Sequence, residues 1–65
     1  MITINGKAFV PAAPMTVGAY LDAHGYRRER IAVEKNGSIL PKSVYDTTVL
    51  QDGDQIEIVS FVGGG

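Results

Sequence analysis

The chain has 65 residues, of which 45% are hydrophobic and 20% charged, and its formal net charge is -1. A chain of this length buries only about 60% of the surface that its unfolded form exposes, so it forms one domain at most. The small net charge gives no broad field that would attract nucleic acid or an anionic membrane, and neither is expected as a partner. The lack of cysteine excludes a disulfide, a thiolate nucleophile and a thiolate metal site.

The ends and the apolar runs of the sequence indicate where the protein works. Residues 1–6 lack the basic, apolar and small-residue zones of a secretory signal, and no apolar run approaches the roughly 20 residues that span a bilayer. We therefore expect a cytoplasmic protein whose mature form is the whole chain.

Residues 1–10 predict a β-hairpin. Ile2 and Ile4 alternate with polar residues, Asn5-Gly6 supplies the positive φ angles of a tight turn, and residues 7–10 form the returning strand. Two prolines then end the pairing by residue 14, because proline cannot donate a hydrogen bond to a sheet.

A short helix is expected next, with Thr16 as its N-cap and Gly25 in the left-handed position after its last turn. Tyr20 and Leu21 lie on the same face of this helix. Gly18 weakens it by roughly 1 kcal/mol relative to alanine, so the helix depends on packing against a sheet.

Segments rich in β-branched residues predict the remaining strands: residues 31–34, 38–40 and 55–62, with a further β-prone stretch at 47–50. Residues 26–30 are interpreted as a solvated loop. This order of elements in so short a chain predicts an α+β fold in which one main helix packs across the sheet.

The last strand is apolar on both faces in its second half. If Ile56 and Ile58 face the core, the period of two places Val59 and Phe61 on the opposite face, with Val62 following them. Two interpretations remain open: either a loop or neighbouring strand covers these side chains, or they form a docking patch for another protein.

The chain ends in Gly63, Gly64 and Gly65. We expect residues 1–62 to form the domain and residues 63–65 a flexible tail that reaches roughly 10 Å from it. An α-carboxyl group has a reference pKa of about 3.3 to 3.7, so the Gly65 carboxylate is ionised at neutral pH and able to attack the α-phosphorus of ATP. The alternative is a frayed end, a linker or a cloning remnant without chemistry.

The chain lacks the equipment to activate that carboxylate itself. It has no glycine-rich phosphate loop followed by Lys and Ser or Thr, and its single histidine, His24, is interpreted as a helix-end residue. Asp52-Gly53-Asp54 lacks the other ligands of a calcium loop, so it is expected to form a turn, and no metal site is predicted. A partner enzyme must therefore carry out the activation.

The run from Leu50 to Gly65, LQDGDQIEIVSFVGGG, resembles the C-terminal signature of the ThiS family of sulfur carriers in thiamine biosynthesis. The segment from Ile2 to Lys7 and the pair Thr16-Val17 are also similar to that family. The resemblance implies a ubiquitin-like β-grasp fold, with a mixed sheet of four to five strands and one main helix.

The resemblance also implies a function and partners. A ThiF-like adenylyltransferase would use ATP and magnesium to adenylate Gly65, and a sulfur donor system would convert it to a thiocarboxylate. The thiazole synthase ThiG would then accept the sulfur. The residues implied or suspected to contact these partners are Val59, Phe61, Val62, Gly63 and Gly64. Gly18 and Ala19 depart from the larger or acidic residues frequent in relatives.

Three alternatives remain. The first is the small subunit of molybdopterin synthase, whose members approach the tail through a proline-containing segment, whereas no proline follows Pro41 here. The second is a β-grasp binding module that transfers nothing. The third is an enzyme acting alone, which the missing catalytic constellation disfavours.

Overall fold

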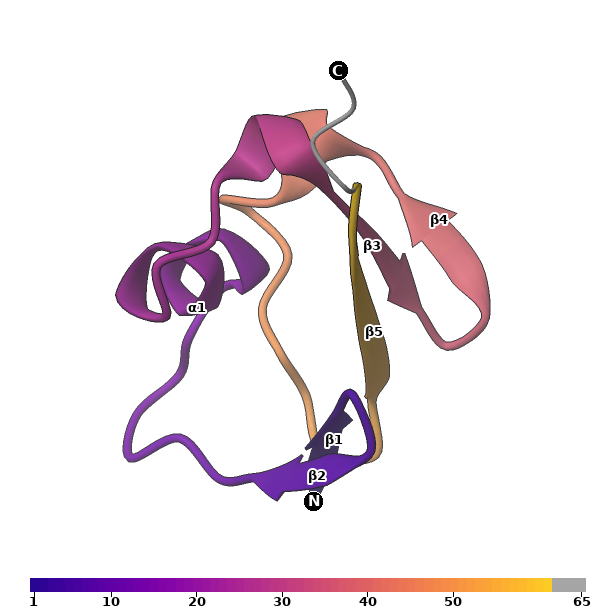
Figure 1. Ribbon diagram of the computed structural model, residues 1–65. Coiled ribbons are helices and arrows are strands. Elements are labelled where there is room, and N and C mark those ends of the chain that lie inside the picture. The colour runs from indigo at the N-terminus through magenta and orange to yellow at the C-terminus, as the bar shows by residue number, and fades with distance from the viewer. Residues whose placement is uncertain (62–65) are drawn as a thin grey trace.

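A computed structural model of the chain describes residues 1–61 (Figure 1). The predictions for Val62 and for the tail of residues 63–65, including the boundary between domain and tail, lie outside the described residues. The elements in chain order are β1 (Ile2–Ile4), β2 (Lys7–Phe9), α1 (Val17–Ala23), a 3-10 turn (Arg28–Arg30), β3 (Ile31–Lys35), β4 (Ser38–Leu40), a second 3-10 turn (Lys42–Val44) and β5 (Gln55–Ser60).

The five strands form one mixed sheet in the order β2-β1-β5-β3-β4. β1 and β5 run parallel, whereas β1 with β2, β3 with β4 and β3 with β5 are antiparallel. The helix α1 lies across one side of this sheet (Figure 1). The predicted α+β fold with one main helix is confirmed.

Both tight turns form where Asn-Gly pairs predict them. Asn5 has a φ of 50° and Gly6 of 81°, and Asn36 and Gly37 have φ angles of 52° and 86°. Asparagine and glycine tolerate this left-handed conformation, which matches the twist of the flanking strands. The sequence alone therefore located both hairpins correctly.

The helix α1 begins and ends at the predicted residues. The Thr16 hydroxyl accepts a hydrogen bond from the Ala19 N–H at 3.1 Å, which satisfies a backbone donor that the first turn leaves free. At the other end Gly25 has a φ of 76°, and the Tyr26 N–H donates to the Leu21 carbonyl at 3.0 Å. This pair of caps delimits a helix of only seven residues.

The core lies between α1 and the face of the sheet that α1 covers. It consists of apolar side chains from every layer: Ile2, Ile4, Val17, Leu21, Ile31, Val33, Tyr45, Leu50, Ile56 and Ile58. Full burial of each such side chain stabilises the fold by roughly 1.5 to 3 kcal/mol. The short helix is thus held by packing, as expected.

The β-prone stretch at residues 47–50 does not join the sheet. Its one bridge pairs Val49 with Thr16, and its backbone is tied to the start of the helix: Val17 N–H donates to the Thr48 carbonyl and Leu50 N–H to the Met15 carbonyl, each at 2.8 Å. These bonds bring the segment alongside the helix start, so the β-prone residues 47–50 form no strand of the sheet.

Within the described part of the chain, the last strand, β5, ends one residue earlier than predicted. It ends at Ser60, and the next residue still pairs, because the Phe61 N–H donates to the Arg30 carbonyl at 2.8 Å. The sheet therefore fixes the position of Phe61. No helix within residues 1–61 is long and apolar enough to cross a membrane.

Candidate docking face

Val59 and Phe61 lie on the side of the sheet that faces away from α1. Along β5 the buried side chains are those of Ile56 and Ile58, and the alternate residues are exposed. Val59 is 50% exposed and Phe61 56% exposed. Among the residues that the structure describes, no loop or strand covers these two side chains, so the covered interpretation is wrong for Val59 and Phe61.

The sheet register places further side chains beside them. Val59 is directly opposite Ala32 on β3. Two residues further along the same strands, and on the same face, Glu57 is opposite Glu34. On the far side of β3, Glu34 is opposite Ile39 of β4, which is 67% exposed. We call these residues the outer sheet face: Ala32, Glu34, Ile39, Glu57, Val59 and Phe61.

Side chains from the two Asn-Gly turns hold β5 in place. The Asn5 amide bonds to both backbone groups of Ile58, with Oδ1 accepting from the nitrogen at 2.7 Å and Nδ2 donating to the oxygen at 3.3 Å. Asn36 Oδ1 accepts from the Gln55 N–H at 2.8 Å, and its own N–H donates to the Gln55 carbonyl at 2.8 Å. β5 is thus anchored on both edges.

A buried carboxylate closes the turn before β5. Asp54 accepts from the Gln51 N–H at 2.9 Å and from Asn36 Nδ2 at 3.1 Å, with Lys35 Nζ at 3.6 Å. Burial alone would raise the pKa of Asp54, but these donors and the Lys35 charge outweigh it and hold the pKa below its ordinary value. The predicted turn at residues 52–54 is confirmed as structural.

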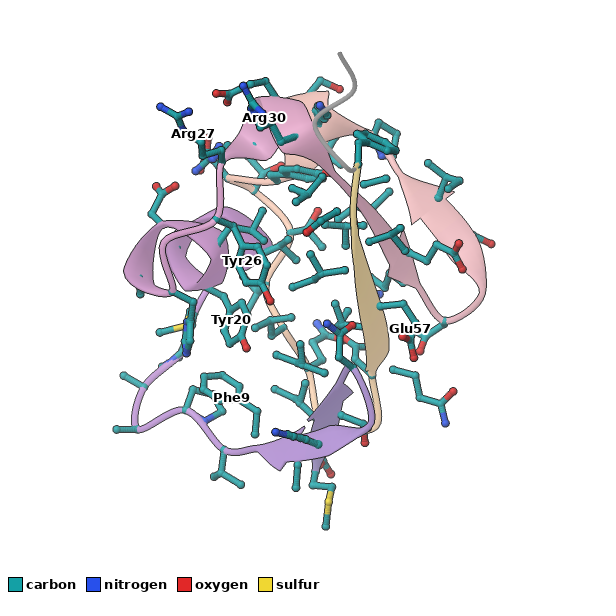
Figure 2. The ribbon with its side chains drawn as sticks, viewed as in Figure 1. Phe9, Tyr20, Tyr26, Arg27, Arg30 and Glu57 are labelled. Atoms are coloured by element: carbon teal, nitrogen blue, oxygen red, sulfur yellow. The ribbon has the colours of Figure 1, made fainter. Side chains whose placement is uncertain are left out.

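His24 is a helix-end residue, as predicted. Its Nδ1 lies 2.9 Å from the Tyr20 carbonyl oxygen, and its ring stacks on the Tyr20 ring with centroids 4.0 Å apart. Phe9 completes the group, with its ring edge-to-face to Tyr20 at 5.0 Å. Figure 2 shows Phe9 and Tyr20 between the hairpin and the helix. These contacts give the imidazole a packing role.

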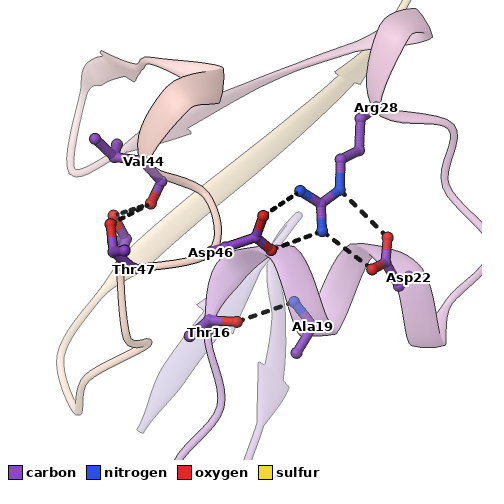
Figure 3. A network of polar contacts seen from close by, with 8 residues as sticks. Thr16, Ala19, Asp22, Arg28, Val44, Asp46 and Thr47 are labelled. Atoms are coloured by element: carbon purple, nitrogen blue, oxygen red, sulfur yellow. Dashed lines mark hydrogen bonds and ion pairs between the residues drawn. The ribbon is translucent and has the colours of Figure 1, made fainter.

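The predicted solvated loop at residues 26–30 is wrong for Arg28. Its guanidinium lies between two carboxylates, donating to Asp46 at 2.8 and 2.9 Å and to Asp22 at 3.0 and 3.3 Å (Figure 3). These bonds raise the pKa of Arg28 and lower that of Asp46. The network ties α1, the 3-10 turn and the segment before β5 together.

The network also explains why Gly18 stands in the helix. A β-carbon there would overlap Asp46 Oδ1 and lie 2.7 Å from Arg28 Nη2. Glycine lets the Asp46 and Arg28 side-chain ends approach the helix this closely without moving aside. The small residue at position 18, where relatives frequently carry a larger one, is therefore explained by packing.

The described residues also form an apolar hollow of about 230 Å³ between the hairpin and residues 50–52. Its two charged lining groups, the Asp52 carboxylate and the N-terminal amine of Met1, pair with each other. Within residues 1–61, no group of three or more His, Cys, Asp or Glu side chains could hold a metal ion.

Sequence reasoning correctly placed Val59 and Phe61 opposite the core side of the last strand, but it did not identify the other residues of the face. Ile39, Glu34 and Glu57 come from three strands, and their neighbourhood depends on register between segments far apart in the sequence. The one available signal was the alternation within residues 31–35 and 55–60, which assigns each residue to a face without revealing its neighbour.

The chain is similar to known proteins over nearly its whole length. Residues 1–65 match the ThiS family. A sulfur carrier protein ThiS from Bacillus subtilis is 36% identical over 66 residues, which cover all of both chains. The crystal structure of a thiamine biosynthesis protein (ThiS) from Geobacter metallireducens superposes with a TM-score of 0.79 at 37% identity, covering 98% of this chain and 97% of that one.

One relative is a much larger protein, a thiazole synthase. A thiazole synthase from Paramagnetospirillum magneticum is 45% identical over 64 residues, but this chain spans only 20% of that protein's length. The matches to carriers, in contrast, cover both chains almost completely. The chain therefore belongs to the ThiS family, the sulfur carrier proteins of thiamine biosynthesis.

Proposed function

We propose that this carrier holds its sulfur as a thiocarboxylate on Gly65. The observation that supports the proposal is the position of Phe61. A backbone hydrogen bond to Arg30 anchors this residue at the end of β5, and only four residues follow it up to the Gly65 carboxylate. Four residues span up to about 14 Å when extended. Glycine at the last three positions would let that arm enter a narrow channel of another protein.

The chemistry takes two steps. In the first, the Gly65 carboxylate attacks the α-phosphorus of ATP, pyrophosphate leaves, and an acyl-adenylate forms. In the second, a nucleophilic sulfur at the oxidation level of hydrosulfide attacks the acyl carbon and AMP leaves with the bonding electrons. The product is a thiocarboxylate, and no oxidant or reductant is consumed. Adenylation is needed because a bare carboxylate repels an incoming nucleophile.

Partner enzymes would carry out both steps. A ThiF-like adenylyltransferase would bind ATP and magnesium, a sulfur donor system would supply the sulfur, and a thiazole synthase of the ThiG type would receive it. The thiazole synthase of Paramagnetospirillum magneticum, one fifth of which matches this chain, supports such an association. The residues proposed to contact these partners are Val59, Phe61, Val62, Gly63 and Gly64.

Deletion of Gly65 tests this assignment. The shortened chain should keep its thermal midpoint and its affinity for thiazole synthase, because the anchored body of the domain is unchanged, yet thiazole formation in a reconstituted assay should fall to background. The matched control is a chain extended by one alanine after Gly65, because the added residue removes the free carboxylate of Gly65 without shortening the tail. Full activity of the shortened chain would contradict the proposal and would indicate that the protein is a binding module without a transferable group.

A further inference from the structure

Both asparagines of the chain precede a glycine, in the pairs Asn5-Gly6 and Asn36-Gly37. The side-chain amide of an asparagine can react with the backbone nitrogen of the next residue. Glycine favours this reaction because it has no β-carbon to hinder the approach and leaves the backbone free to turn. In the unfolded chain, these two positions are therefore the ones most prone to spontaneous deamidation.

The reaction consumes only water. The backbone nitrogen of Gly37 attacks Cγ of Asn36, a new C–N bond forms, the Cγ–Nδ2 bond breaks, and Nδ2 leaves as ammonia with the proton of the glycine nitrogen. Water then opens the resulting five-membered imide at either carbonyl, which gives aspartate or isoaspartate. One water is taken up, one ammonia is released, and nothing is oxidised or reduced.

The fold engages the whole amide of Asn36. Its Oδ1 accepts from the Gln55 N–H at 2.8 Å and its Nδ2 donates to Asp54 Oδ1 at 3.1 Å. The backbone N–H of Asn36 also donates to the Gln55 carbonyl, at 2.8 Å. To turn Cγ onto the nitrogen of Gly37, the side chain must therefore give up both of its bonds to the start of β5.

Asn5 is held in the same way by the middle of β5. Its Oδ1 accepts from the Ile58 N–H at 2.7 Å, its Nδ2 donates to the Ile58 carbonyl at 3.3 Å, and its backbone N–H donates to the Ile56 carbonyl at 2.9 Å. Two hairpins on opposite sides of β5 thus protect their reactive asparagines by the same device.

We propose that Asn5 and Asn36 are deamidation sites that the fold suppresses through these side-chain hydrogen bonds, and that reaction at Asn36 is the one that destabilises the domain. This modification goes beyond the sulfur chemistry at Gly65 and does not depend on it. Reaction at either site requires its hairpin to separate locally from β5. The rate at each asparagine therefore reports how often that separation occurs.

The two products differ because their surroundings differ. At Asn36 the new carboxylate oxygen replaces the group that donates to Asp54, whose residue is only 5% exposed. Within residues 1–61 the cation paired with Asp54 is Lys35, at 3.6 Å, and two adjacent carboxylates repel each other when both are ionised. At Asn5 the new oxygen faces only the Ile58 carbonyl, and the other oxygen keeps the shorter bond from the Ile58 N–H.

The first test incubates the whole chain at mildly alkaline pH, in buffer and in denaturant, and locates the mass change of deamidation by fragmentation. Both sites should react readily in denaturant and about tenfold or more slowly in buffer. Asp54→Ala, under conditions in which circular dichroism shows it folded, should accelerate the reaction at Asn36 and leave Asn5 as the reference within the same molecule. Equal rates in buffer and denaturant, or equal acceleration of both sites in Asp54→Ala, would overturn the proposed protection.

The second test compares the product mimics Asn36→Asp and Asn5→Asp by their thermal midpoints across pH. Repulsion raises the pKa of the paired carboxylates in folded Asn36→Asp, so its stability is lost as the pH rises from about 4 toward neutral. Its midpoint should lie well below that of Asn5→Asp at neutral pH, and the difference should narrow below about pH 4. The neighbouring charges, Lys35 and the pair formed by Asp52 and the Met1 amine, are the same in both variants. Equal midpoints at neutral pH, or a difference that does not change with pH, would refute the assignment of Asn36.

Discussion

The side-chain amide of Asn5 pairs with both backbone groups of Ile58, accepting from its nitrogen at 2.7 Å and donating to its oxygen at 3.3 Å. β1 has already ended at Ile4, and the asparagine side chain takes the place of one more strand residue. One side chain therefore holds the middle of β5, three residues before Phe61.

Asn5→Gly should lower the free energy of unfolding by about 1 to 3 kcal/mol, because glycine keeps the positive φ but leaves the Ile58 groups without these partners. Denaturant titration measures the loss. Lys7→Ala, an exposed change in the same hairpin, should stay within about 0.5 kcal/mol of the wild type. Equal stability of the two variants would show that the Asn5 bonds contribute nothing.

Gly18→Ala should stabilise the chain by less than the about 1 kcal/mol that alanine normally gives in a helix. The added methyl group forces the ends of the Asp46 and Arg28 side chains to move, which weakens their ion pair. In an Asp46→Ala background alanine should give its full gain, so the two positions should be coupled. Additive effects in this double-mutant cycle would argue against the steric explanation.

Stability should decrease in acid partly through Asp54. Its pKa in the folded chain lies below the ordinary value of 3.8, so its contribution is present above that value and is lost as the pH falls through the lower, folded pKa. Asp54→Asn removes this titration and should flatten the dependence of the unfolding free energy on pH below about 5. Parallel curves for the variant and the wild type would contradict the role of Asp54.

Phe61→Asp should reduce activation by the adenylyltransferase far more than it reduces stability. The side chain is 56% exposed, so the thermal midpoint should change little, while a charge in an apolar contact disrupts docking. Val10→Asp, at a site 79% exposed outside this face, is the control. Equal losses of thermal stability and activation in Phe61→Asp would indicate that Phe61 serves packing.

Local features of the fold were predictable because their causes lie within a few residues of sequence. Thr16 caps the helix through Ala19, and Asn5 and Gly25 adopt the left-handed conformations that their residue types favour. The resemblance of residues 50–65 to the ThiS family is confirmed by the match over residues 1–65, which supports a carrier over an enzyme acting alone and over the molybdopterin alternative.

Features that depend on contacts between distant segments were not predictable in this way. Arg28 reaches Asp46, 18 residues away, and Glu34 meets Glu57 only through the register of β3 and β5. Residues 47–50 have strand-forming side chains, yet backbone bonds to the helix start keep them out of the sheet. The assignments of Val62 and of the glycines at 63–65 remain predictions.

The most direct test of the central claim is the intact mass of the chain after incubation with ATP, magnesium, the adenylyltransferase and a sulfur source. We predict a product heavier by the difference between one sulfur and one oxygen atom, located by fragmentation at Gly65 and absent without ATP or in the chain lacking Gly65. An unchanged mass under conditions in which the chain binds the adenylyltransferase, or a sulfur located at any other residue, would contradict the account.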